Sequence, residues 1–329
     1  MNKISFYSVS LEERAQLKKL KLKLPADYHS VKLGLKNLPN KDTEIISIHA
    51  DSKIGKEVFD KLPNLKLIVT RTAGFDHVDL KLATARGVKV ANCPGLNADS
   101  VAEFVFGLIL HAYRDFTKAL AAGKKLNYHG QDAELFGREL RGKTLGIVGT
   151  GAIGSYVARI GQGFGMNLLG FDAKKNTTLA KETGLKYVSL FDLVKKSDVV
   201  TFHVPAIPST NKMVSTSLLA KFKPGSLLVN TARGAVVDTQ AVLKALQAGK
   251  LGGYVADVLE LESTPKNVSK FTASQSRMWA IQKKLANMPN VLLTPHTAHA
   301  TVDADQRIFA HTFEVILGFQ KGQKISYLN

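Results

Sequence analysis

The stretch Leu145-Gly146-Ile147-Val148-Gly149-Thr150-Gly151-Ala152-Ile153-Gly154 decides the fold class of this chain. An apolar run typical of a buried strand leads directly into Gly-x-Gly-x-x-Gly, and an amphipathic helical pattern follows from Ser155 to Gly163. A bare glycine motif is weak evidence, since glycines cluster in many turns. Between a strand and a helix, however, such glycines let the backbone approach a pyrophosphate at a helix N-terminus. The sequence therefore predicts a dinucleotide site with contacts from Gly149, Gly151, Ala152, Ile153 and Gly154.

The residue after the next predicted strand indicates which dinucleotide is bound. Asp172 stands 18 positions past Gly154, where an acid can accept hydrogen bonds from the adenosine ribose. Its charge would repel a 2′-phosphate, so NAD is favoured over NADP, although Lys174 and Lys175 weaken the preference. Taken alone, His203 is more often a packed histidine at a strand end than a ligand contact. Further predicted cofactor contacts follow later strands of the same sheet: His203, Val204, Pro205, Thr210, Thr231, Ala232, Arg233 and Asp257.

Short apolar runs alternate with helical patterns along the whole chain, which is typical of an α/β protein with parallel strands. A first unit contains apolar runs at 45–48, 67–70 and 88–91, and a long helix begins near Asn97. A second, larger unit starts at Thr144. Its predicted strands are 145–148, 167–171, 199–202, 226–229, 253–256 and 291–294. The tail from His296 to Asn329 is expected to form one or two helices and to pack back onto the first unit.

Composition narrows the class of protein. The chain has 329 residues, 45% of them hydrophobic, and one cysteine, Cys93, so it forms no intrachain disulfide. The N-terminus lacks a signal-peptide pattern, and no apolar run reaches the ~20 residues that span a bilayer. A cytoplasmic protein with no membrane partner is therefore expected.

The net charge of +18 would attract anions such as nucleotides and carboxylates. The lysines are spread along the chain, and no zinc-finger spacing or RNA-binding aromatic motif is present, so no nucleic-acid partner is expected. The densest run, Lys18-Lys19-Leu20-Lys21-Leu22-Lys23, is interpreted as a solvated helix end. No metal site is predicted.

Three residues downstream of the glycine turn could carry chemistry on an oxo acid. Reduction of a 2-oxo acid builds negative charge on the carbonyl oxygen, and His296 could supply the proton because imidazole titrates near neutral pH. Glu262 could orient the ring and raise its pKa. Arg233 could bind the substrate carboxylate through paired donors. In isolation such residues are more often a strand-end histidine, a helix-capping glutamate and a surface arginine than members of a catalytic site.

Five motifs in order resemble those of the D-isomer-specific 2-hydroxyacid dehydrogenases, and the resemblance runs essentially from end to end. The arginine segment 230–234, followed by Val237-Asp238, is similar to the arginine motif of that family. The segments 257–262 and 294–298, the latter with Thr301, are similar to those that carry the acid and the histidine. The other two motifs are Thr72-Ala73-Gly74-Phe75-Asp76-His77-Val78-Asp79 and Ser100-Val101-Ala102-Glu103.

The resemblance implies two doubly wound parallel-sheet domains with a cleft between them. A discontinuous flavodoxin-like substrate domain would comprise residues 1–97 and 297–329, and a Rossmann-like NAD-binding domain residues 98–296. A homodimer and the R configuration at C2 are also implied. The catalytic residues would be Arg233, Glu262 and His296. The substrate contacts would be Ala73, Gly74, Leu96, His49, Arg233 and His296.

The long stretch between Glu262 and His296 resembles the D-lactate dehydrogenase branch, which favours pyruvate and D-lactate as substrates. Leu96 stands where lactate-type members often have tyrosine, and this indicates a more apolar pocket. Ala152 and Val255 also depart from the usual pattern. His299 is interpreted as a pocket-lining or surface residue. A glyoxylate/hydroxypyruvate reductase and an NAD-sensing, corepressor-like binding protein remain the alternatives.

Overall fold

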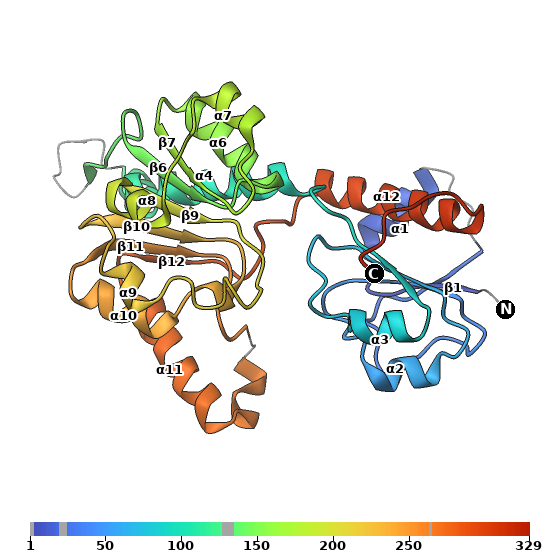
Figure 1. Cartoon of the computed structure of the whole chain (residues 1–329). Coiled ribbons are helices and arrows are strands. Elements are labelled where there is room, and N and C mark those ends of the chain that lie inside the picture. The colour runs from blue at the N-terminus through green and yellow to red at the C-terminus, as the bar shows by residue number, and fades with distance from the viewer. Residues whose placement is uncertain (1–2, 20–24, 127–134, 263–264) are drawn as a thin grey trace. The chain divides into compact units, whose positions relative to one another are not determined.

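The computed structural model describes residues 3–19, 25–126, 135–262 and 265–329 (Figure 1). The chain divides into two compact units, one running to Asn97 and completed by Ala300–Asn329, the other spanning Ala98–His299. The lysine-rich run that begins at Lys18 falls mostly outside the described residues. Among the described helices, none is both long enough and apolar enough to cross a membrane.

The first unit is built on a five-stranded parallel sheet. In spatial order its strands are β2 (Asp27–Tyr28), β1 (Ile4–Phe6), β3 (Ile45–Ile48), β4 (Leu67–Thr70) and β5 (Lys89–Ala91). Every residue of β3 and β4 is buried, as expected for parallel strands covered on both faces. The helices α1 (Leu11–Lys19) and α12 (Val302–Gln320) lie on one face, and α2 (Lys56–Lys61) and α3 (Leu80–Ala85) on the other (Figure 1). The order 2-1-3-4-5 is that of flavodoxin-like folds.

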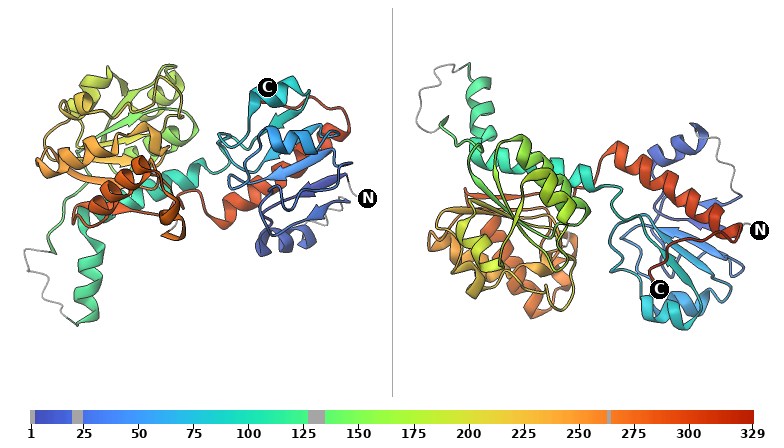
Figure 2. Two further views of the ribbon diagram at one scale, coloured as in Figure 1. Left: turned by 90° about the horizontal axis from the view of Figure 1, so that it is seen from below. Right: turned by 45° about the horizontal axis from the view of Figure 1, so that its top comes forward.

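The C-terminal helix α12 belongs to the first unit. Phe309 and Phe313 pack against Phe6 of β1, with ring centroids 6.1 and 5.3 Å from it. Figure 2 shows α12 lying along this sheet. Beyond the helix, the amide of Leu328 donates to Val90 O of β5 at 2.8 Å. The chain therefore returns to its first sheet after completing the second unit.

The second unit contains a seven-stranded parallel sheet. In spatial order its strands are β12 (Val291–Leu293), β11 (Leu251–Ala256), β10 (Ser226–Asn230), β9 (Val199–Phe202), β6 (Thr144–Val148), β7 (Asn167–Phe171) and β8 (Lys186–Tyr187). When β6 to β11 are counted as strands 1 to 6, they lie in the Rossmann order 3-2-1-4-5-6. The strand β12 extends the sheet beyond β11. Successive residues of β10 alternate between two cores, because Leu228 lies in one and Leu227 and Val229 in the other.

Helices cover both faces of the second sheet. The core that contains Leu227 is shared with α4 (Ala98–Arg114), α6 (Ala152–Gly163) and α7 (Thr177–Thr183). The core that contains Leu228 is shared with α8 (Leu190–Lys196), α9 (Thr216–Leu219), α10 (Thr239–Gln247) and α11 (Ala273–Ala286). The unit also contains α5 (Phe116–Lys124) and the 3-10 turns η2 (Gly234–Val236) and η3 (Pro265–Lys270). The predicted class, with two doubly wound parallel sheets, is confirmed.

Candidate functional site

His296 is presented by a strained loop after β12. Its φ of +57° lies in the left-handed region, which is unfavourable for a residue with a side chain. Asp257, which follows β11 and is 2% exposed, holds this loop on both sides of the histidine. Its Oδ1 accepts hydrogen bonds from Thr294 Oγ1 at 2.5 Å and Thr297 N at 2.9 Å, and its Oδ2 accepts one from Ala298 N at 2.9 Å. The loop therefore keeps a conformation that His296 alone would not favour.

Glu262 and His296 form the ion pair that the sequence predicted. His296 Nδ1 lies 2.9 Å from Glu262 Oε2, and Glu262 Oε1 accepts a hydrogen bond from Leu259 N at 3.3 Å. The Glu262 hydrogen bond is the main cause that raises the pKa of His296 above its ordinary value, whereas partial burial and the charge of Arg233 oppose it. Because Nδ1 faces the carboxylate, Nε2 is the nitrogen that can exchange a proton with a ligand.

Arg233 follows β10 in a loop fixed by Asn230. The Asn230 side chain donates to Arg233 O at 3.0 Å and accepts from Ala232 N at 3.1 Å, and Arg233 Nη1 donates to Ala232 O at 2.8 Å. The next residue, Gly234, touches the segment that leads to Glu262, since a Cβ at this position would lie 1.9 Å from Leu259 O. The loops that carry the arginine and the acid are therefore in direct backbone contact.

The turn after β6 has the features that an NAD pyrophosphate requires. Gly151 is the N-cap of α6 and supplies no side-chain cap, so the first amides of the helix face outward. A Cβ on Gly154 would lie 1.9 Å from Gly149 O, so only glycine lets the helix start this close to the turn. Asp172 Oδ2 accepts from Thr150 N at 2.6 Å and from Thr150 Oγ1 at 3.1 Å. This acid is thereby tied to the glycine turn.

The loop after β9 lies beside the same turn. His203 N donates to Val148 O at 2.7 Å, and its Nε2 contacts Thr201 Oγ1 at 3.0 Å. Burial lowers the pKa of His203 to about 3, so its ring is neutral. Among the described residues, neither His203 Nδ1 nor Thr231 Oγ1 has a hydrogen-bond partner although both are buried, which suits a polar ligand such as NAD. Thr210 Oγ1 instead donates to Pro205 O at 2.5 Å and stabilises its own loop.

The first unit contains the other predicted substrate residues. Asn92 Nδ2 donates to Ala73 O at 2.6 Å, and Thr72 Oγ1 donates to Gly74 O at 2.5 Å, so both carbonyls of this loop are fixed. Leu96 O accepts from Arg307 Nε at 3.0 Å. The roles of Ala73, Gly74, Leu96 and His49 as substrate contacts stay predictions.

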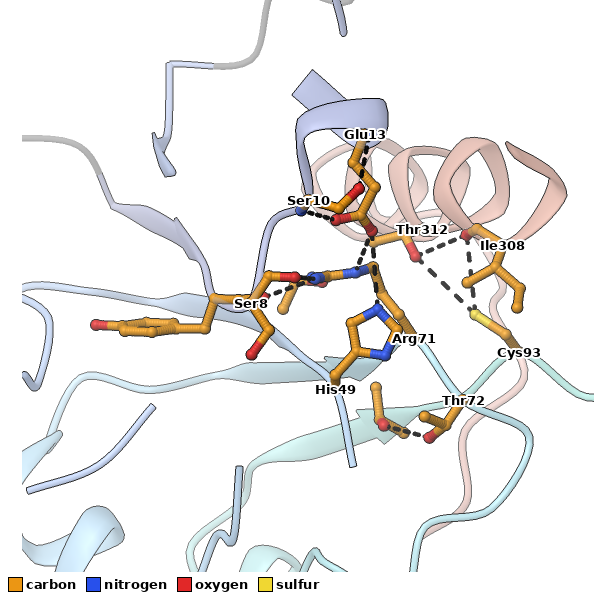
Figure 3. Close-up of polar contacts among 12 residues, drawn as sticks. Ser8, Ser10, Glu13, His49, Arg71, Thr72, Cys93, Ile308 and Thr312 are labelled. Carbon is orange, nitrogen blue, oxygen red and sulfur yellow. Dashed lines mark hydrogen bonds and ion pairs between the residues drawn. The ribbon is translucent and has the colours of Figure 1, made fainter. Parts of the chain in front are cut away.

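A buried ion pair near His49 was not foreseen from the sequence (Figure 3). Glu13 Oε1 lies 2.9 Å from Arg71 Nε, and both side chains are 0% exposed. His49 Nε2 lies 3.8 Å from the same carboxylate oxygen. Arg71 also donates to Ser47 Oγ at 2.9 Å and to Tyr7 O at 2.6 Å. These bonds fix Arg71, which directly precedes the loop that contains Ala73 and Gly74.

Comparisons with known proteins agree with this geometry. Residues 106–298 match the family model described as "D-isomer specific 2-hydroxyacid dehydrogenase, NAD binding domain". The chain is 35% identical to the glyoxylate reductase of Korarchaeum cryptofilum over 287 residues, covering 86% of this chain and 81% of that protein. It is 33% identical to the hydroxypyruvate reductase of Thermotoga maritima over 275 residues, covering 84% of each.

Solved structures extend the likeness over almost the whole chain. The D-lactate dehydrogenase from Aquifex aeolicus, complexed with NAD and lactic acid, is 38% identical, with a TM-score of 0.84 and coverage of 97% of this chain and 96% of that one. The pyruvate reductase of Chlamydomonas reinhardtii is 31% identical, with a TM-score of 0.82 and coverage of 99% and 98%. NAD is therefore the cofactor, and the chain belongs to the D-isomer specific 2-hydroxyacid dehydrogenases.

Proposed function

We propose that this chain interconverts a 2-oxo acid and the corresponding D-2-hydroxy acid with NAD, and that pyruvate and D-lactate are its main substrates. The observation that carries the proposal is the 2.9 Å pair of His296 and Glu262, formed in a unit that also presents Arg233 after a neighbouring strand. A histidine that holds its proton more tightly than usual, close to a fixed cation, suits proton transfer to a carbonyl oxygen of an anionic substrate.

Each residue of the trio has a distinct proposed role. When bound, NADH supplies the hydride. His296, protonated, donates its Nε2 proton to the carbonyl oxygen, and in the reverse direction neutral His296 removes the proton from the hydroxyl. Glu262 stabilises the imidazolium through Nδ1. Arg233 binds the substrate carboxylate and offsets the charge that develops on the oxygen.

The end-to-end match to a structure with bound lactic acid supports pyruvate and D-lactate. The curated relatives favour a second candidate, glyoxylate reduction, because the protein of Korarchaeum cryptofilum and three others are named glyoxylate reductases. Steady-state rates with pyruvate, glyoxylate, hydroxypyruvate and 2-oxoisocaproate decide between them. A kcat/KM for glyoxylate well above that for pyruvate would refute the D-lactate assignment.

Replacement of His296 tests the activity itself. We expect His296→Ala to lose roughly 10²- to 10⁴-fold in kcat for 2-oxo acid reduction while NADH still binds. His299→Ala is the matched control, because the His299 ring lies edge-on to His296 at 5.6 Å and has no proposed part in proton transfer. Turnover of His296→Ala at the unchanged rate would sink the proposal, as would an absence of turnover in the parent protein with every 2-oxo acid.

The pH dependence follows from the direction of the pKa shift. The Glu262 hydrogen bond raises the pKa of His296. Because reduction uses the protonated ring, kcat/KM for the 2-oxo acid should be level below that raised pKa and fall as pH increases through it. Oxidation of the hydroxy acid uses the neutral ring, so its kcat/KM should increase over the same interval. Parallel pH profiles for the two directions would contradict this assignment.

A further inference from the structure

The helix α11 buries a glutamine in a position suited to an apolar side chain. Half of the residues of α11 are polar, and its buried residues are Gln282 and Leu285, spaced like neighbours on one helix face. Leu285 belongs to the hydrophobic core, whereas Gln282 is 3% exposed and brings a polar amide into the same layer. A buried amide is costly unless its hydrogen bonds are made, so its partners indicate its purpose.

The partners of Gln282 are the two backbone polar groups of Leu261. With the amide oriented to satisfy both, its nitrogen donates to Leu261 O at 3.1 Å and its oxygen accepts from Leu261 N at 3.1 Å. Leu261 O belongs to the peptide that joins Leu261 to Glu262, and Leu261 N belongs to the preceding peptide. One side chain therefore fixes both peptide planes next to the residue that pairs with His296.

Glu262 depends on this support because, besides His296, its side chain is bonded only to Leu259 N, at 3.3 Å, among the interactions of the described residues. It is 44% exposed, so packing does not select its rotamer. The segment before it is fixed, since Glu260 Oε2 accepts from Thr239 N at 2.9 Å and Leu259 packs on the core that contains Leu285. Gln282 fixes the next part of the segment, up to the peptide bond between Leu261 and Glu262.

We propose that Gln282 is a positioning residue that directs Glu262 toward His296. The proposal rests on the proposed function, in which this pair holds the proton that is transferred. The hydrogen bonds of Gln282 go to the backbone of Leu261, so its influence reaches His296 through Glu262. An apolar residue at 282 would fill the space but would leave both peptide groups of Leu261 without these partners.

The test is an NMR titration of the His296 imidazole in the full chain without cofactor, comparing the parent protein with Gln282→Leu and Leu285→Ala. Loss of the amide should move the midpoint of His296 to lower pH by about half a unit to one unit, because Glu262 then spends less time at Nδ1. Leu285→Ala removes core contacts of the same helix but leaves the amide in place. It should lower Tm while the midpoint stays where it is in the parent protein.

Kinetics provide the second measurement. In Gln282→Leu, kcat for 2-oxo acid reduction should fall about tenfold with little change in KM, and the descending limb of its pH profile should move to lower pH. Coincident His296 midpoints in Gln282→Leu and the parent protein would overturn the proposal and leave Gln282 a merely structural residue, as would an equal shift in Leu285→Ala. A His296→Gln variant with the parental rate would instead remove the proposed function, and this proposal with it.

Discussion

Substitution of Glu13 by glutamine is expected to destabilise the first unit selectively. Glu13 and Arg71 are 0% exposed and 2.9 Å apart (Figure 3). In Glu13→Gln the side chain keeps its shape, but the buried guanidinium loses the stronger of its compensating charges, Asp305 being the other. The amide also offers one acceptor oxygen where the carboxylate offers one each to Arg71 Nε and Ser10 N. The Arg71 acceptors Tyr7 O and Ser47 Oγ are neutral and remain in place. The variant therefore changes the charge and one hydrogen bond but not the packing.

The size of the expected loss of stability follows from the complete burial of the Glu13–Arg71 ion pair. Breaking a buried ion pair by removing one partner costs about 3–5 kcal/mol, and the remaining acceptors place this case near 3 kcal/mol. A urea slope of about 1.5–2 kcal/mol per molar converts that cost into a midpoint shift of about 1.5–2 M. Since whole domains are stable by about 5–15 kcal/mol, the loss is a substantial part of the stability of the first unit.

The two units can be followed separately because Trp279 is the one tryptophan of the chain and lies on α11 of the second unit. Urea unfolding monitored by circular dichroism should show an early transition in Glu13→Gln, whereas the fluorescence transition of Trp279 should stay at its parental midpoint. Asp60→Asn is the control, because Asp60 pairs with Lys56 and Arg86 at the surface of the same unit. It should change the first transition little. Equal shifts in Glu13→Gln and Asp60→Asn would refute the reasoning from burial.

Two further perturbations are predicted from the structure. Gly234→Ala would place a Cβ 1.9 Å from Leu259 O, so it should separate the arginine and acid loops and lower kcat/KM about 100-fold. Gly107→Ala is the control and should be tolerated, because its Cβ would meet no neighbouring atom within 4 Å. Equal kcat/KM values for the two variants would contradict the steric argument. Burial raises the pKa of Asp305, so its ionisation destabilises the folded state increasingly as pH rises from the unfolded pKa to the folded pKa. Asp305→Asn should therefore stabilise the first unit more at pH 8 than at pH 4 in urea unfolding, and the opposite order would exclude this account.

The strands and the glycine turn could be predicted because their signals are local. Parallel strands covered on both faces read as continuous apolar runs, and the runs 199–202 and 226–229 match β9 and most of β10. The two shortest strands, β2 and β8, have two residues each and leave no such pattern. The pairing of Glu262 with His296 was foreseen through a family resemblance, since 34 positions separate the two residues.

The supporting residues could not be predicted, because their partners are distant and their chemistry is unusual for a protein interior. Charged residues are rarely buried, so nothing local marks Glu13 or Arg71 for the core. The cofactor contact of Asp257 stays a prediction, and what the sequence did not indicate is that both its oxygens are bonded to the loop that carries His296. The helix α11 has only two buried residues, so its sequence shows little helical periodicity of apolar residues. The capping box of Thr272 and Gln275 nevertheless indicates where the helix begins.

The magnitudes explain why the proposed catalytic pair needs buried residues behind it. Glu262 and His296 are 44% and 42% exposed, and an ion pair at such exposure contributes at most about 1 kcal/mol. Ordering a glutamate side chain costs about 1.5–2 kcal/mol, and the left-handed backbone of His296 costs about 1–3 kcal/mol more. The pair therefore cannot hold itself together. The three hydrogen bonds that the buried carboxylate of Asp257 accepts, at about 1.5–3 kcal/mol each, exceed the backbone cost. The fold therefore sets the orientation of the Glu262–His296 pair. Substitution of a buried residue that supports this pair should alter proton transfer although that residue does not contact the substrate.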